Sequence, residues 1–530
     1  MEGRLKPLGR RGWGMLLLIL VFAGCLRGWR LGEPAEFACD EMYYVPAAYT
    51  YVVGTHDTNE LHPPMGKILI ADGMRLGLQL RHLGFFVLNS ACWRITPLLC
   101  GLGVVALTFF LAYRLSQGSL VVAELASFLV ASDFLSITMS RLAMLDMVLS
   151  FWILLGSWFA CLYIGEDESK QKSFIYILAC FCSFGVAVAV KWSALCMAGT
   201  CFVFLCLGYR KKLSRGGAPL VSSETSALPE TEAVSLTVAT PAVLSPTSSG
   251  GNDASLTAAE LTASVPALLN SETSPLTMAE PPASTSELPN GEAVATASAE
   301  HVASVGNAQF VWAMGRLLLL FAVIIACIYT IAYVPQFLRE GFNYETLNNI
   351  FFAYYRVLFM HLNPKMAVNY NLAPCWAWPL GLIPMLVFAK NNAVQISSVT
   401  ICGSIVFWWF GGYQTLKSLF VGWRFGDTNV LFTAFMWLSS WLFWILSIGG
   451  FLFYLLPGIP FMAVATAEAL ERLVEAKKHK LVGLYLLLLG SALALYYPLL
   501  TYIPISNVFM HRLVPMWLVD FLELFRQFFH

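Results

Sequence analysis

Residues 37–74 read FACDEMYYVPAAYTYVVGTHDTNELHPPMGKILIADGM and lie between the first two long apolar segments of the chain. This stretch gathers ionisable side chains in a chain that is only 12% charged. They are Asp40, Glu41, His56, Asp57, Glu60, His62, Lys67 and Asp72. In a protein made mostly of membrane helices, clustered polar groups mark a place where something polar is handled. We therefore expect the rest of the chain to hold this loop against a membrane-embedded substrate.

The composition indicates an all-α polytopic membrane protein. Of the 530 residues, 58% are hydrophobic, and the mean hydropathy is +0.67. Soluble domains are about 45–50% apolar, and several apolar runs here reach the roughly 20 residues that a spanning helix needs. The formal net charge of zero gives no sign of a nucleic-acid partner. Most cysteines lie inside apolar runs, where small packing residues are expected rather than disulfides or zinc ligands.

The apolar pattern predicts about 11 transmembrane helices. They cover about 13–31, 94–113, 120–134, 142–164, 174–190, 193–208, 311–335, 403–421, 430–446, 451–470 and 481–502. Arg4, Lys6, Arg10 and Arg11 precede the first helix, which places the N-terminus in the cytoplasm and the loop outside. No small-residue cleavage site follows the first apolar run, so it is interpreted as a span and not as a removed signal peptide.

The chain divides into three parts. Residues 1–215 form an N-terminal transmembrane catalytic module with its loop at 32–93, and residues 307–530 form a C-terminal transmembrane module with an outer loop at 336–402. Between them, residues 216–306 are rich in Ser, Thr, Ala, Pro and Glu. Such a segment cannot bury enough apolar surface to offset its ordering entropy. We expect a disordered cytoplasmic insert, with a docking or modification tether as the functional alternative.

The segment 376–400 leaves the helix count open. Residues 376–388 are apolar but short and broken by Pro379 and Pro384, so they either span the membrane or rest at its surface. Lys390–Asn392 and the alternation that follows are typical of a hairpin with a turn. A surface position is preferred, because it keeps the basic run 477–480 inside. The tail 514–529 carries large apolar residues at helical spacing and is expected on the outer membrane surface.

Asp40 and Glu41 are the candidate catalytic acids. Successive side chains of an extended or turning segment point to opposite sides, so one acid can face a reaction centre while the other pairs with a basic group. A carboxylate beside an apolar wall has a raised pKa, and a nearby cation lowers it. Between these influences it can accept a proton from a hydroxyl. The alternative is a solvated pair of acids without chemistry.

His62-Pro63-Pro64 predicts an extended turn that leads into a short helix near Met65. Lys67 falls in the first turn of that helix, where an N-terminus could receive phosphate. A rigid interfacial helix is the alternative. His56, Asp57, Glu60 and His62 could in principle form a metal site, but their spacing fits no standard zinc pattern. No metal is therefore expected, and a bound divalent ion is the alternative.

Charged residues also stand near the outer ends of the predicted helices. They are Arg94, Asp133, Arg141, Asp146 and Lys191. Charges at helix ends can simply snorkel to the interface, but five on the side of the loop suggest a polar pocket. The planar, permanently charged guanidinium of arginine suits phosphate binding. Arg141, Lys191 and Lys67 are the candidates for stabilising a leaving phosphate.

Several blocks together resemble the protein O-mannosyltransferase family of the GT-C class. Asp40-Glu41 matches its acidic pair, 62–67 (HPPMGK) resembles its HPPLGK block, 140–146 (SRLAMLD) with Asp133 resembles its SRxxxLD block, and Lys191-Trp192 matches its KW pair. His361, Tyr370 and the segment 375–380 (CWAWPL), with Trp376, resemble a further substrate-binding block. The sequence departs from that pattern at Asn369, where the family has His, and at Gly449-Gly450, near where it has Arg. No MIR-like β domain lies in the 336–379 loop, so the resemblance is to the bacterial branch.

The resemblance implies a GT-C fold and an integral membrane enzyme. It implies transfer of one sugar, mannose, from a polyprenyl-phosphate carrier to a protein Ser or Thr hydroxyl with inversion. Asp40 would be the general base, and Arg94 would match a basic residue that opens the second span. The same enzyme class acting on lipid A or another glycolipid is the alternative. A transporter is a rival from another class, but it should show repeated halves and broken helices at mid-membrane. The resemblance favours a bacterial inner membrane over the ER, with the site on the periplasmic or lumenal side.

Overall fold

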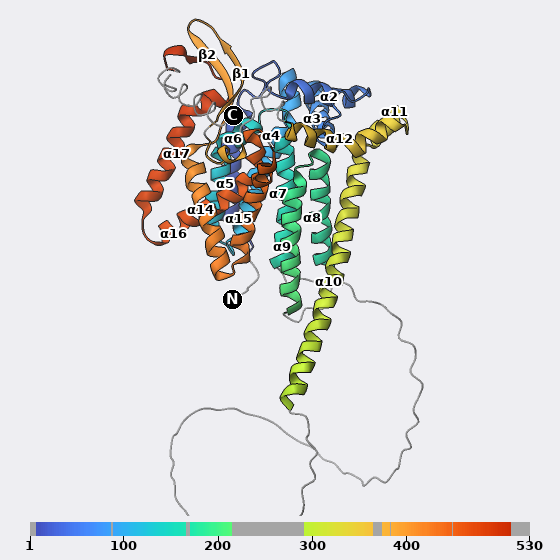
Figure 1. Cartoon of the computed structure of the whole chain (residues 1–530). Helices are drawn as coiled ribbons and strands as arrows, with labels where there is room; N and C mark the ends of the chain where they lie inside the picture. The colour runs from blue at the N-terminus through green and yellow to red at the C-terminus, as the bar shows by residue number, and fades with distance from the viewer. Residues whose placement is uncertain are drawn as a thin grey trace, which may run out of the picture. The chain divides into compact units, whose positions relative to one another are not determined.

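A computed structural model describes residues 7–85, 88–165, 170–214, 291–363, 374–381, 383–447 and 449–509. Contacts divide the chain into two units. One unit comprises Met1–Leu220 with Phe310–His530. The other comprises Val221–Gln309. Figure 1 shows the helical bundle with most of its elements labelled.

Apolar helices, most of them long, build the first unit, and α10 (Gly291–Ala332) enters it from the second unit. In the N-terminal half they are α1 (Arg10–Gly28), α4 (Asn89–Leu115), α5 (Leu120–Ser132), α7 (Leu145–Gly165), α8 (Lys170–Val190) and α9 (Ala194–Ser214). In the C-terminal half they are α10 (Gly291–Ala332), α14 (Ile405–Phe425), α15 (Thr428–Trp441), α16 (Ile459–Glu475) and α17 (His479–Leu500). The 3-10 helices η2 (Leu442–Leu446) and η3 (Leu452–Gly458) extend α15 and precede α16.

Each apolar segment singled out in the sequence coincides with one of these helices. In the described part of the chain, eight helices are long and apolar enough to cross a membrane by length and composition. The protein is thus a mostly helical, multi-pass membrane protein, as expected. The larger number of spans stays a prediction, because helices such as α5 and α9 are shorter apolar helices.

Glycines let the central helices approach closely. A Cβ added at Gly103 of α4 would meet the Phe151 ring of α7 at 2.6 Å, and one at Gly156 of α7 would meet Phe184 of α8 at 2.8 Å. Close backbone approach through small residues is the usual way in which membrane helices gain packing energy. The helix α7 therefore stands at the centre of the N-terminal half and can carry a residue from its first turn into a buried site.

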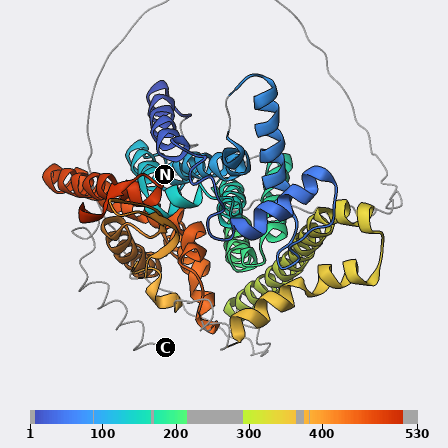
Figure 2. The same cartoon turned by 90° about the horizontal axis from the view of Figure 1, so that it is seen from above.

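The remaining α-helices gather at the end of the bundle that also carries the hairpin (Figure 1). They are α2 (Glu41–Val53), α3 (Met65–His82), α6 (Phe134–Met139), α11 (Val334–Glu340) and α12 (Tyr344–Leu362). The helix predicted near Met65 is confirmed as α3. The expectation of an extended or turning segment at the acid pair is only partly right, since Asp40 is the N-cap and Glu41 the first residue of α2. Seen from above, α11 and α12 lie at the edge of the bundle beside α10 (Figure 2).

The predicted hairpin is confirmed and is longer than expected. Strand β1 (Met385–Asn391) pairs antiparallel with β2 (Gln395–Ile401), with an irregularity between Leu386 and Phe388. A short strand β3 (Ile505–Ser506) completes the order β1-β2-β3. In the described part of 376–388, the end of the 3-10 helix η1 (Cys375–Ala377) is followed by turns and β1, so this segment forms no spanning helix.

The insert expected over 216–306 lies outside the described residues up to residue 290, as does the tail at 514–529. Residues 291–306 differ from the expectation, because they form the start of α10 and not an unstructured stretch. No proline follows Pro289 in this stretch, and it is rich in alanine, the best helix former. A helix that begins downstream can therefore extend back to Gly291.

Candidate active site

The two neighbouring acids have separate roles. Glu41 is fully buried and ion-paired to Arg94, which is also fully buried. The Arg94 Nε donates to Glu41 Oε1 at 2.8 Å and Nη2 donates to Oε2 at 2.7 Å, while the backbone N–H groups of Ala38 and Ala143 also donate to this carboxylate. Glu41 thus joins α2, α4 and the segment before α7. Because all its lone pairs are engaged, Glu41 is suited to structure and not to proton transfer.

Asp40 is engaged in fewer hydrogen bonds than Glu41 within the part of the chain that the structure describes. It is half-buried, and among the described residues its carboxylate accepts a long contact from the Cys39 thiol at 4.0 Å. Burial raises the pKa of Asp40 above its ordinary value, Asp146 raises it further, and the positive charge of Lys191 opposes both. A carboxylate that is partly desolvated and not held by a guanidinium is able to accept a proton.

The charges of a second buried ion pair act on the pKa of Asp40. Lys191, directly after α8, donates from Nζ to Asp146 Oδ1 of α7 at 2.8 Å, and both side chains are buried. Asp146 Oδ2 is buried without a hydrogen-bond partner in the described structure. Such an orphaned acceptor is costly unless a donor reaches it. The pair therefore has one position open to a further polar group.

Aromatic rings cover this pair. The Lys191 ammonium lies 4.4 Å from the centroid of the Tyr454 ring of η3, a cation–π contact. Tyr454 stacks on Trp444 at 4.4 Å and meets the edge of Trp378 at 5.8 Å. Burial and the charges of Asp40 and Asp146 raise the pKa of Tyr44 of α2, so the same charges act on its hydroxyl. Asp40, Asp146, Lys191, Tyr44 and Tyr454 are called the acid–lysine site below.

Two buried arginines fix the chain that leads to Asp40. Arg141 donates from Nη1 to the carbonyls of Arg27 at 2.7 Å and Trp29 at 2.6 Å, and from Nη2 to Arg30 at 3.0 Å. These carbonyls belong to the end of α1, where the last turn lacks intrahelical donors. Arg94 continues the series, donating to the carbonyls of Leu31 at 3.1 Å, Pro34 at 2.8 Å and Glu36 at 3.3 Å. Burial lowers the pKa of Arg141 to about 10, so it remains charged at neutral pH.

Arg27 is a residue that the sequence reasoning missed. Its guanidinium is fully buried and donates to Ala131 O at 2.8 Å, Val130 O at 3.0 Å and Ser136 Oγ at 3.0 Å. It thereby joins α1 to the end of α5 and to α6. The signal was present in the sequence, since an arginine inside an apolar span must find buried acceptors. Asp133 lies at the same junction, accepting from Trp408 Nε1 at 2.7 Å and from the Ser136 N–H at 2.8 Å.

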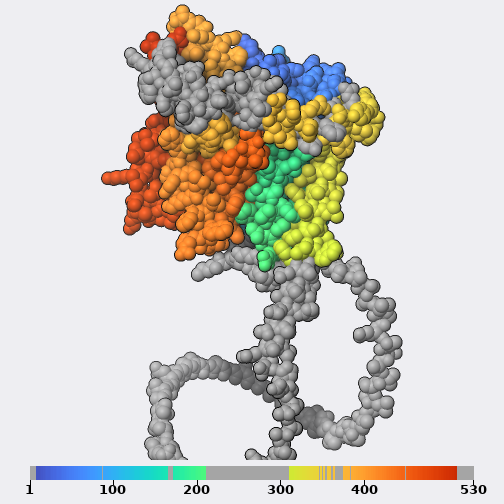
Figure 3. Space-filling model, viewed as in Figure 1, coloured from blue at the N-terminus to red at the C-terminus, as the bar shows by residue number. Residues whose placement is uncertain are grey.

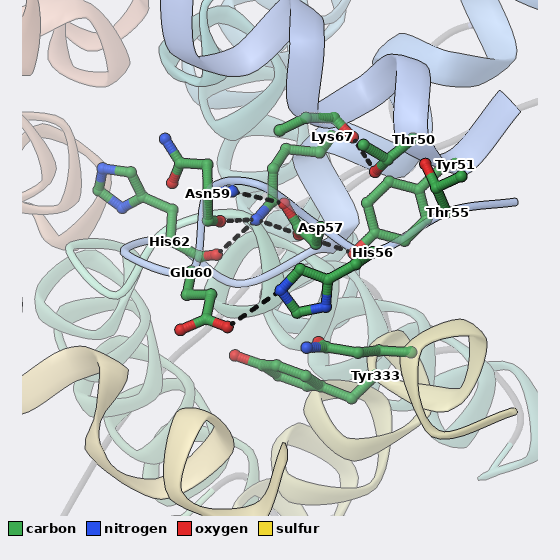
Figure 4. Close-up of polar contacts among 12 residues, drawn as sticks. Thr50, Tyr51, Thr55, His56, Asp57, Asn59, Glu60, His62, Lys67 and Tyr333 are labelled. Atoms are coloured by element: carbon green, nitrogen blue, oxygen red, sulfur yellow. Dashed lines mark hydrogen bonds and ion pairs between the residues drawn. The ribbon is translucent and has the colours of Figure 1, made fainter. Parts of the chain in front are cut away.

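Lys67 is the centre of a separate polar cluster, drawn in Figure 4. Its ammonium lies 2.5 Å from Asp57 Oδ2, is only 1% exposed, and also donates to the carbonyls of Asn59 and His62. The Tyr51 hydroxyl donates to the same Asp57 oxygen at 2.8 Å. Burial lowers the pKa of Lys67, and the charge of Asp57 opposes this. Lys67 therefore rigidifies the loop 57–62 and does not present its charge to a substrate phosphate.

The remaining candidates are dispersed. The centroid of the His62 ring lies 5.9 Å from that of the Tyr44 ring. Trp376 of η1 is 39% exposed. His361 lies in α12 but its side chain is outside the described structure, as is all of Tyr370. His56 contacts Glu340 at 2.6 Å and Glu60 at 3.6 Å. Over the described ranges, no group of three His, Cys, Asp or Glu side chains is arranged to hold a metal ion.

Comparisons with known proteins agree with the geometry of the N-terminal half. Residues 17–222 match the family described as dolichyl-phosphate-mannose-protein mannosyltransferase. The chain is 31% identical over 199 residues to the polyprenol-phosphate-mannose–protein mannosyltransferase of Mycolicibacterium smegmatis, a match that covers 35% of this chain and 36% of that protein. It is 27% identical over 203 residues to the dolichyl-phosphate-mannose–protein mannosyltransferase 1 of Candida albicans, covering 36% of this chain and 22% of the relative. The matches thus span about a third or less of these relatives.

Solved structures extend the likeness to the whole fold. A chain of the S. cerevisiae protein O-mannosyltransferase Pmt1-Pmt2 complex bound to the sugar donor superposes with a TM-score of 0.63, at 11% identity, over 96% of this chain and 92% of that chain. ArnT from Cupriavidus metallidurans bound to undecaprenyl phosphate superposes with a TM-score of 0.52, at 14% identity, over 90% of this chain and 63% of that one. At these identities the likeness concerns the fold alone. The chain therefore has the GT-C fold, and its residues 17–222 are similar to the dolichyl-phosphate-mannose-protein mannosyltransferase family.

Proposed function

We propose that the chain is a membrane glycosyltransferase that moves mannose from a polyprenyl-phosphate carrier to a Ser or Thr hydroxyl of a protein. The named activity of the M. smegmatis relative and the family match over 17–222 support the donor and the acceptor class. The observation that carries the proposal is the division of labour in the acid pair. The Glu41 carboxylate is held in an ion pair with Arg94. Asp40 is half-buried, its carboxylate is available to accept a proton, and the charge of Lys191 acts on it.

Asp40 would act as the general base. Its carboxylate takes the proton of the acceptor hydroxyl as the hydroxyl oxygen bonds to the anomeric carbon of the sugar. The bond from that carbon to the carrier phosphate breaks on the opposite face, and the configuration inverts. The electron pair leaves with the phosphate. A base with a raised pKa holds the proton more firmly than an ordinary aspartate, which favours this step at neutral pH.

Lys191 is the best-placed cation for the leaving phosphate. Arg141 is occupied by the carbonyls of α1, and Lys67 by Asp57 and the loop carbonyls. The Lys191 ammonium is shared between Asp146 and the Tyr454 ring, and it acts electrostatically on Asp40. Charge development on the phosphate oxygens is stabilised best by a cation already fixed in a buried place. Asp146 then holds this ammonium in position.

The orientation is part of the proposal. Basic residues before α1 support a cytoplasmic N-terminus. The acid–lysine site then opens on the periplasmic or lumenal side, where a secreted or membrane protein acceptor is present. A bacterial inner membrane is favoured over the ER because the chain resembles the branch without a MIR domain. Residues 216–290 would then be a cytoplasmic tether.

Purified protein incubated with labelled polyprenyl-phosphate mannose and a Ser/Thr peptide tests the function. We expect labelled peptide from the wild type and almost none from Asp40→Asn. A parallel arm replaces the peptide by lipid A or another glycolipid acceptor. Label in the glycolipid alone would replace the protein acceptor, and absence of transfer to every acceptor by a folded wild type would refute the enzyme. In liposomes, solute movement without product would instead indicate a transporter.

A further inference from the structure

Among the described strands, the sheet of the hairpin has one unpaired edge. Because the strand order is β1-β2-β3, β1 is an edge strand. Across the turn the Asn392 N–H donates to Gln395 O at 2.9 Å. Alternate residues of a strand point their N–H and C=O groups to the same side. The backbone groups of Asn392 thus face β2, and those of its neighbour Asn391 face the opposite side. Ala389, two residues before Asn391, also directs its N–H and C=O groups away from β2.

The register agrees with this assignment. Ala389 lies opposite Ser398, and the Ser398 carbonyl accepts from the Tyr502 N–H at 3.1 Å. Tyr502 lies close to β3, on the side of β2 that is turned from β1. The pair Ala389–Ser398 is thus not joined by ladder hydrogen bonds. Among the described residues, no backbone or side-chain group bonds to the outward N–H and C=O of Ala389 or Asn391, and both residues are exposed.

This open edge is attached to the segment that carries the base. The Lys390 ammonium is ion-paired with Glu36, four residues before Asp40 in the sequence. Arg94, which holds Glu41, also holds the Glu36 carbonyl at 3.3 Å. Figure 3 shows the hairpin (orange) and residues of the loop region (blue) at the same end of the bundle.

The other end of β1 leads to the cover of the acid–lysine site. A few residues before β1, Trp378 packs edge-on against Tyr454 at 5.8 Å. Tyr454 in turn lies over Lys191. Contacts therefore link both ends of β1 to the site. Near one end Lys390 pairs with Glu36, whose carbonyl accepts from Arg94, and before the other end Trp378 packs against Tyr454.

We propose that an extended segment of the acceptor polypeptide adds to the outer edge of β1 as a further strand. This inference rests on the proposed function and specifies how that acceptor is held. Backbone hydrogen bonds recognise any extended peptide regardless of sequence, which suits an enzyme that must modify many Ser and Thr residues. A lysine on an edge strand usually guards it against pairing, but the Lys390 charge is taken up by Glu36. With respect to the residues that the structure describes, the outward groups of Ala389 and Asn391 remain open for a peptide.

The first test is a scan of N-methylated acceptor peptides with the wild-type protein. Each N-methyl group removes one peptide donor. Strand addition predicts that methylation at alternate positions raises the acceptor KM by about two- to tenfold per lost hydrogen bond, while the positions between have little effect. A flat scan, or one without a two-residue period, would overturn the docking. If the unmethylated peptide is not labelled at all, the proposed function fails and not the docking alone.

A variant of the edge provides the matched control. Ala389→Pro removes the outward N–H but no ladder bond, and proline is tolerated on an edge strand. It should raise the KM for a long peptide by about two- to tenfold. Transfer to N-acetyl-threonine amide, which is too short to use the edge, should be unchanged. Ala389→Val keeps the N–H and should behave as wild type. Equal losses for both acceptors would contradict the proposal, as would a dimer that Ala389→Pro dissociates, because the edge would then pair two copies of the chain.

Discussion

At the scale of single residues, the acid pair shows how far the sequence reaches. The sequence correctly indicated that one acid would pair with a basic group, and the structure identifies this pair as Glu41 and Arg94. Which lysine or arginine would remain available could not be predicted. Arg141 and Lys67 are both used internally, because backbone carbonyls at the end of α1 and in the loop 57–62 compete for their protons. Such acceptors have no sequence signature.

Asp40→Asn should lower turnover by about 10²–10⁴-fold, the usual contribution of a general base. The amide has nearly the same shape but cannot take the proton, so donor affinity should stay at the wild-type value. Glu41→Gln should affect stability instead, because it leaves the Arg94 charge buried and uncompensated, a change that costs about 3–5 kcal/mol. Turnover, donor binding and thermal unfolding of both variants check this. Near wild-type turnover of Asp40→Asn, with an inactive but stable Glu41→Gln, would show that the acids have the opposite roles.

The raised pKa of Asp40 predicts a pH effect on turnover. The base works only when deprotonated, so activity should be lost as pH falls through a pKa above the ordinary aspartate value of about 3.9. Asp146 contributes to that rise and Lys191 opposes it. Asp146→Asn removes a negative charge and should therefore lower the pKa of Asp40. The acidic limb of the turnover profile should then move to lower pH, even if the maximal rate also falls. The profile of turnover against pH for the two proteins is the measurement, and a limb that stays in place would contradict the coupling.

Arg141 is expected to be a positioning residue. Its variant Arg141→Ala should leave donor affinity close to wild type, because its protons bond to the end of α1 and not to a phosphate. Turnover should fall, since the chain leading to Asp40 loses its anchor. Arg141→Lys, which keeps the charge but not the fork, should recover little of the rate. Weaker donor binding with unchanged turnover at saturation would restore the phosphate role suggested by the sequence.

At the scale of elements, periodicity and length predicted the long helices, because an apolar run of about 20 residues has few alternatives in a membrane. The helices α2 and α12 were not predicted. Their residues mix aromatic, polar and small side chains, and tertiary contacts such as the Glu41 bonds decide their conformation. The hairpin was predicted from Lys390-Asn391-Asn392 and the following alternation. Its beginning at Met385 was missed, because the apolar residues there resemble a membrane-facing segment.

The hairpin gives a prediction about sidedness. A single cysteine at Asn392, in a background without accessible native cysteines, should react with an impermeant thiol reagent added from the periplasmic or lumenal side. Asn392 lies at the turn between β1 and β2 and is exposed, so the cysteine should be reactive. The substitution removes the two bonds that Asn392 Oδ1 accepts from the Val394 and Gln395 N–H groups but keeps the backbone bond from Asn392 N–H to Gln395 O that closes the turn. A cysteine at Lys478, expected on the cytoplasmic side, is the matched control. Labelling of position 392 from the cytoplasm only would invert the proposed orientation.

At the scale of the whole molecule, the insert lies between two chain segments, Met1–Leu220 and Phe310–His530, which fold together as one unit. The residues of the acid–lysine site come from both halves, since Asp40, Asp146 and Lys191 precede the insert and Tyr454 follows it. None of the site contacts among the described residues involves 221–309. We therefore predict that deleting 221–290, which keeps all of α10 (Gly291–Ala332), leaves transfer to a Ser/Thr peptide close to the wild-type rate. The two halves need only a link long enough to let them pack, because loop-closure entropy changes slowly with length.

Purified full-length and deleted proteins should be compared for transfer rate, thermal unfolding and donor affinity in one preparation. Asp40→Asn in the deleted background is the control, and it should remove the activity there as it does in the full chain. A short Gly/Ser link of about ten residues in place of 221–290 separates the effect of tether length from that of its sequence. If the deleted protein is folded and binds donor but transfers no sugar, and the Gly/Ser link does not restore transfer, the insert itself takes part in catalysis. That result would contradict the separation of a catalytic unit from a tether.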